Sequence, residues 1–293
     1  MLFLRVKDSS SSGCGVWYPP VEDFLLSRIA QNRFLSIAAP GCGHTVSADG
    51  TLSPPTQSAS LATLERITRT MHSLSVDVTP VVVVRDPTVA ATLVRSTAAA
   101  EKLAAALTKE ADSFHYAGFV LSLNLSSIGS SGDDDDTKLA ALLIACSTAL
   151  TNSPDASASE RQSRTISIEL NRVRKDDALA RAIAASPAAS VIVRVVASTS
   201  APDFTSFEQS AADAVSQFGG HGVPFSIGLS LRADSWWGGS ERPSIVDVVE
   251  RRDALGNLNI KQVTLDVGWS DASFVADQSR LDLYQLALLA PYR

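Results

Sequence analysis

Eight short apolar runs recur along the chain, and their order constrains the fold more than any other feature. Strands of a parallel sheet covered on both faces have such near-continuous apolar sequences, because both faces of each strand are buried. Each interval between the runs is long enough for a crossover helix. The pattern predicts an α/β fold, a complete eight-stranded parallel (β/α)8 TIM barrel. The runs are LFLRV (2–6), RFLSIAA (33–39), VTPVVVV (78–84), AGFVLSLNL (117–125), TISIEL (165–170), SVIVRVVA (190–197), PFSIGLSL (224–231) and QVTLDVGW (262–269).

The intervals between the runs carry helical spacing. Leu139, Leu142, Leu143, Cys146 and Leu150 form one apolar stripe, as expected of a helix that packs against the outside of a sheet. Residues 89–107 indicate another helix, and residues 281–288 a last one after the eighth run. The 293 residues fit a single barrel domain spanning 1–293.

Composition excludes several classes of partner. A net charge of -6 does not favour binding to nucleic acid. The opening MLFL is too short for the apolar region of a signal peptide or for a membrane-spanning helix. Three cysteines, an odd number in a large chain, argue for reduced thiols. We therefore expect no membrane insertion and a location in the cytoplasm or another reducing intracellular compartment.

Polar residues follow most of the predicted strands, at the end of a barrel where active sites are built. Two carboxyl groups and nearby indole rings could act as a glycosidase, in which one protonated acid and one carboxylate flank a sugar bond. Glu169 and Asp266 would be that pair, and the sugar platforms would be Trp236, Trp237 and Trp269. The simpler interpretation is that these charges pair with one another and keep the barrel mouth hydrated.

Other motifs carry little chemistry. Cys42 and His44 in GCGHT lack the further ligands that a metal needs, and a reduced cysteine in a glycine-rich loop explains them. GCG at 13–15 and 41–43 lacks the third glycine of a dinucleotide fingerprint. We therefore expect no cofactor and no metal. Asp133 to Asp136, at the end of a Ser- and Gly-rich loop, are expected to cap a helix and meet solvent.

Residues 78–124 resemble the N-terminal barrel domain of the symmetric (type II) protein arginine methyltransferases. The likeness continues in TISIEL, in ALARAIAASPAASVIV (178–193) and in SAPDFTSFEQSA. It implies a barrel that docks adaptor subunits, while a following domain, which this chain lacks, binds the cofactor. The favoured function is thus a non-catalytic scaffold, a pseudoenzyme with a protein partner. The contact candidates are Trp17, Tyr18, Trp236 and Trp237, which could equally be ordinary loop packing.

HYAGFVLSLN also resembles the acidic strand of chitinase-type barrels. Ala117, Val120, Ser122 and Asn124 stand where that family carries its acids, the catalytic glutamate included. Without a carboxylic acid at the strand end, the proton donor of that family is missing. This resemblance implies a non-catalytic relative, and hydrolysis by Glu169 and Asp266 remains the enzyme alternative.

Overall fold

The computed structural model describes most of the chain between Leu2 and Trp269. The described residues are 2–6, 34–38, 44–54, 58–73, 75, 77–128, 133–170, 173, 177–186, 190–196, 204–230, 245–260 and 263–269.

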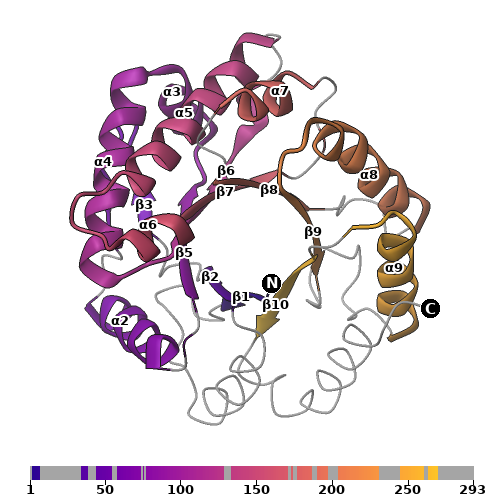
Figure 1. Ribbon diagram of the computed structural model, residues 1–293, viewed down its shortest axis with the longest axis horizontal. Coiled ribbons are helices and arrows are strands. Elements are labelled where there is room, and N and C mark those ends of the chain that lie inside the picture. The colour runs from indigo at the N-terminus through magenta and orange to yellow at the C-terminus, as the bar shows by residue number, and fades with distance from the viewer. Residues whose placement is uncertain are drawn as a thin grey trace.

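Each of the eight apolar runs contains a parallel strand, so that part of the prediction is confirmed. The pairing passes from β2 to β1 and from β10 down to β5, with β1 beside β10 and β2 beside β5. Figure 1 shows these strands around a ring, with helices on the outside. The result is an α/β fold with a parallel sheet. The strands are β1 (Leu2–Val6), β2 (Phe34–Ala38), β5 (Asp77–Val84), β6 (Gly118–Leu123), β7 (Thr165–Leu170), β8 (Val191–Val196), β9 (Phe225–Ser230) and β10 (Val263–Trp269).

A small hairpin, absent from the sequence prediction, joins the sheet beside β5. Its strands are β3 (His44–Val46) and β4 (Leu52–Ser53), which pair antiparallel. β5 pairs with β2 as far as Pro80 and with β3 from Val82. Proline has no N–H to give to a ladder, so a change of partner next to Pro80 costs little pairing.

Helices lie in the described intervals between the strands from β2 onward, and local caps set where several begin. The segment predicted as one helix over 89–107 is two, because Asp86 caps the first and Ser96 caps the second. No helix within the described ranges could cross a membrane. The helix expected at 281–288 lies outside the described residues. The helices are α2 (Ser58–Ser73), α3 (Pro87–Arg95), α4 (Thr97–Phe114), α5 (Asp133–Thr151), α6 (Ala158–Ser163), α7 (Ala178–Ala184), α8 (Phe204–Gln217) and α9 (Ile245–Asn257).

The core has two parts because strand residues alternate between two faces. The large part lies between strands and helices and includes Ile166, Ile168 and Leu170 of β7. The predicted stripe from Leu139 to Leu150 is buried there. A separate small cluster, Val81 of β5 with Val120 of β6, lies on the opposite face of the sheet. We call this face of the whole sheet the inner face.

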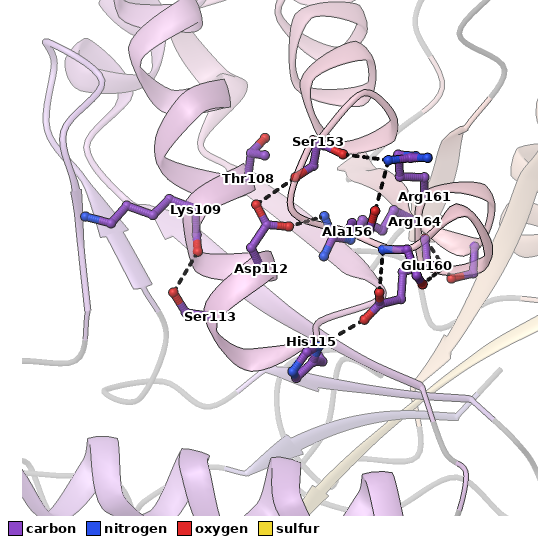
Figure 2. Close-up of polar contacts among 12 residues, drawn as sticks. Thr108, Lys109, Asp112, Ser113, His115, Ser153, Ala156, Glu160, Arg161 and Arg164 are labelled. Carbon is purple, nitrogen blue, oxygen red and sulfur yellow. Dashed lines mark hydrogen bonds and ion pairs between the residues drawn. The ribbon is translucent and has the colours of Figure 1, made fainter.

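A polar network fastens the helices together where the strands begin (Figure 2). Asp112 on α4 accepts hydrogen bonds from Ser153 Oγ and Arg164 Nη1, each at 2.7 Å. Arg164 is only 1% exposed, so its charge depends on that carboxylate. Arg161 donates to the carbonyl oxygens of Ser153 and Ala156. This end of a parallel α/β fold serves stability.

Gly118 tests the packing of β6 against β7. Its φ is +129°, and an added Cβ would lie 1.8 Å from the Thr165 carbonyl oxygen. We expect Gly118→Ala to lower the free energy of unfolding by about 3 kcal/mol or more, measured by urea denaturation. Gly220→Ala is the control, because its Cβ would meet nothing within 4 Å. Equal stability of the two variants would contradict the expected clash.

Asp112 tests the network. Asp112→Ala leaves the buried Arg164 guanidinium without its carboxylate, so we expect a loss of about 3 kcal/mol in the same denaturation experiment. Asp213→Ala is the control, since Asp213 is exposed on α8 and accepts a hydrogen bond from Gln209 of the same helix. A loss no larger than that of the control would show that Arg164 is stabilised in another way.

Candidate functional site

Polar side chains line the inner face of β6 to β9. On β7 the apolar residues belong to the outer core, so Ser167 and Glu169 face inward. By the same alternation Ser122 of β6 lies on the face of Val120. Ser167 and Ser226 are each 2% exposed, whereas Glu169, one position from the end of β7, is half-buried. Hydroxyl groups thus lie deep in the ring, and a carboxyl group lies nearer its C-terminal end.

Arg194 is the charged group next to Glu169. The two residues are direct neighbours in the β7–β8 register, and Ser226 of β9 lies on the other side of Arg194. Arg194 is 1% exposed. Burial lowers its pKa to about 10, and the negative charge of Glu169 opposes that shift. This part of the inner face therefore carries a buried positive charge next to a half-buried negative charge.

The sequence prediction placed Glu169 correctly at a strand end but missed Arg194. The signal for Arg194 was a single charge in the middle of the apolar run SVIVRVVA, where a side chain must face inward or outward into a packed region. A charged residue within such a run indicates an oppositely charged or polar partner on the neighbouring strand. Glu169 is that neighbour.

Asp266 lies on the far part of the ring from Glu169. In register it is opposite Ser230 of β9 and Phe3 of β1. Its backbone therefore sits three strands along the sheet from β7. Trp269 is the last residue of β10. The structure places Asp266 in a strand of the parallel sheet, as predicted, and its pairing with Glu169 stays a prediction.

Asn124 directly follows β6, where the resemblance to chitinases calls for an acid. Its Oδ1 accepts from the Ser126 N–H at 3.2 Å, and its Nδ2 donates to the Arg85 carbonyl oxygen at 2.9 Å. Both ends of the amide are therefore used to hold the turn after β6. An amide is a poor proton donor, so this residue cannot supply the acid of a glycosidase.

Other charged residues at this end have structural partners. Asp86 caps α3 through the N–H groups of Thr88 and Val89. Asp135, expected to meet solvent, is instead 3% exposed and binds Arg95 through both carboxylate oxygens, at 2.8 and 2.7 Å. Asp136 is also buried. The acidic run is therefore not simply hydrated, because part of it anchors α5 to α3.

The contacts of His44 with the described residues are structural. It is fully buried in β3, its Nε2 is 2.9 Å from Glu110 Oε1 on α4, and its ring meets Phe119 edge-on. Its contacts fasten the hairpin to α4. Cys42 lies outside the described residues. Within the described part of the chain no three His, Cys, Asp or Glu side chains come together as a metal site would require.

The four aromatic contact candidates remain untested. Trp17, Tyr18, Trp236 and Trp237 all lie outside the described residues.

A groove opens on the outer surface between α4 and α5. It has a volume of about 730 Å³ and is lined by polar groups that include Lys109, Asp112, Asn152 and Asp155. Figure 2 shows the side chain of Asp112 turned toward Ser153 and Arg164 rather than standing free. The groove lies near the start of β6 and β7, away from Glu169, and we assign it no chemistry.

Solved structures of chitinases have a fold similar to that of this chain. No protein-family model matches the chain, and no curated protein matches it in sequence. Among solved structures, a chitinase from Bacteroides thetaiotaomicron matches with a TM-score of 0.66 at 10% identity, over 99% of this chain and 97% of that one. A chitinase from Chromobacterium violaceum matches at 0.62 and 12%, over 98% and 99%. The spore cortex-lytic enzyme SleL of Bacillus megaterium matches at 0.60 and 11%, over 90% and 69%.

These matches correct two interpretations of the sequence. The likeness to arginine methyltransferase barrels is wrong, because chitinase structures match nearly the whole chain from end to end. The adaptor-docking scaffold built on that likeness is overturned with it. The chain shares the parallel α/β fold of solved chitinases.

Proposed function

We propose that this chain is a chitinase-like barrel of the glycoside hydrolase family 18 type, which acts on a polymer of β-linked amino sugars at the C-terminal ends of its strands. The proposal includes a complete, closed ring of eight strands in one domain. The parallel pairings of β2 with β5 and of β10 with β1 support that closure. The match to chitinases over nearly the full chain supports the substrate class.

One observation carries the proposal: Glu169 is a carboxyl-bearing side chain on the inner face, near the C-terminal end of β7. In this fold, reacting groups project from that end of the strands. Glycoside hydrolysis needs one carboxylic acid to protonate the leaving oxygen. A second carboxylate stabilises the positive charge of the transition state or activates water. Asp266 is the second carboxyl group of the proposal.

A second candidate is glycan binding without hydrolysis. The observation that favours it is Asn124, an amide that occupies the strand end where chitinases carry an acid and whose polar atoms hold the backbone. The serine hydroxyls of the inner face would still be suited to sugar hydroxyl groups. The two candidates share a ligand and differ in whether Glu169 breaks the glycosidic bond.

Glu169 distinguishes the two candidates. If Glu169 acts in hydrolysis, we expect Glu169→Gln to lower the turnover of N-acetylglucosamine oligomers by about 100-fold or more, with binding retained. Turnover is measured by chromatography of the products, and binding by calorimetry. Glu101→Gln is the control, because Glu101 is exposed on α4.

Three outcomes are informative. Hydrolysis that depends on Glu169 supports the enzyme. Binding without hydrolysis in the unsubstituted protein supports the second candidate. Neither binding nor hydrolysis of amino-sugar oligomers would overturn the proposed function.

A further inference from the structure

Two histidines meet on the side of the molecule where the strands begin, away from the proposed glycan site. His72 lies in the last turn of α2, and His115 is the C-cap of α4. Their ring centroids are 6.5 Å apart, at an angle of 68°. His115 Nδ1 is 2.9 Å from Glu160 Oε1 of α6, as Figure 2 shows. Three helices therefore converge on one pair of imidazoles.

The backbone holds both rings in place. His115 has a φ of +55°, and its N–H donates to the Ala111 carbonyl oxygen. Ser75, just beyond α2, has a φ of +57°, and its N–H donates to the His72 carbonyl oxygen at 3.0 Å. This left-handed conformation is uncommon for residues other than glycine, and it is typical of the turn that ends a helix. Each turn therefore ends its helix at a defined residue, beside the contact between the two rings.

We propose that His72, His115 and Glu160 form a pH-sensitive clasp, in which His115, fixed by Glu160, holds the end of α2 against the end of α4 at neutral pH and releases α2 when His72 is protonated. This inference does not depend on the proposed function. Histidine is the side chain whose ordinary titration falls in this range.

The charges around His72 set the direction of the effect. Burial, and then the charge of His115, lower the pKa of His72, while a hydrogen bond with the His115 backbone and the charge of Asp77 oppose that shift. The folded state therefore binds fewer protons at His72 than the unfolded state does. The stability from neutral His72 is present above the ordinary histidine pKa and is lost as the pH falls through the lower, folded value.

Two neighbouring carboxyl groups, Glu160 and Asp77, also have shifted pKa values. Hydrogen bonds from Ser157, followed by that of His115, lower the pKa of Glu160 to about 2, so Glu160 stays charged. Burial raises the pKa of Asp77, and His72 opposes that shift. Protonation of Asp77 on acidification would favour the folded state and would oppose the effect of His72. The loss of α2 protection on acidification is therefore expected from His72 and not from Asp77, whose protonation acts in the opposite direction.

Hydrogen exchange of the full chain tests the clasp. Exchange rates, corrected for their intrinsic pH dependence, are compared from about pH 7.5 to about pH 5.5, across the histidine range. We expect α2 to lose protection at the lower pH while α5 keeps it. His72→Gln should abolish the pH response of α2. His115→Asn should weaken it, because asparagine tolerates the left-handed conformation but brings no imidazole.

His221→Gln is the matched control. His221 also pairs with an acid, Asp177, at 2.7 Å, but it lies beside α7 and α8, so its removal should leave the response of α2 unchanged. A response of α2 that persists in His72→Gln, or no response in the unsubstituted protein, would overturn the clasp. Equal loss of protection in α5 would also overturn it, because the whole fold and not α2 would then be sensitive to acid.

Discussion

Backbone pairing along both edges of the parallel strands is the constraint on which the rest of this structure depends. Once a strand is hydrogen-bonded on both sides, its residues must alternate between the helix-covered face and the inner face. Ile166, Ile168 and Leu170 take the first face of β7, which leaves Ser167 and Glu169 for the second. The register of β7 with β8 then makes Arg194 the direct neighbour of Glu169. Packing on the outside thus determines the polar character of the inside.

The sequence predicted the eight parallel strands because burial on both faces leaves a strong apolar signal. It did not predict the hairpin, because β3 and β4 have only three and two residues and carry no such run. It joined α3 and α4 into one helix because apolar spacing continues through Ser96, whose side chain nevertheless accepts from the Ala99 N–H and starts a new helix. Short strands and helix caps depend on single side chains, which the periodicity of apolar residues does not reveal.

The candidate site was only partly predictable for a similar reason. A position at a strand end identified Glu169, but the partner of a charge lies on another strand, and only the register reveals Arg194. The solvated interpretation of the acidic run failed at Asp135, since the position of Arg95 depends on how α3 packs against α5. The methyltransferase likeness failed because barrels of different function share the same rhythm of strands and helices. Rhythm identifies an architecture, whereas side chains in contact identify a chemistry.

The divided pairing of β5 bears on how chains with this fold could vary in length. One half of that strand is paired by β2 and the other by β3, with the change next to Pro80. The register of β5 against β6 is set on its opposite edge, through pairs such as Val82 with Leu121. A change in the number of residues between β2 and β3 would therefore leave the register of β5 against β6 unchanged. Near Pro80, one edge of β5 can therefore change its pairing while the other edge keeps its register with β6.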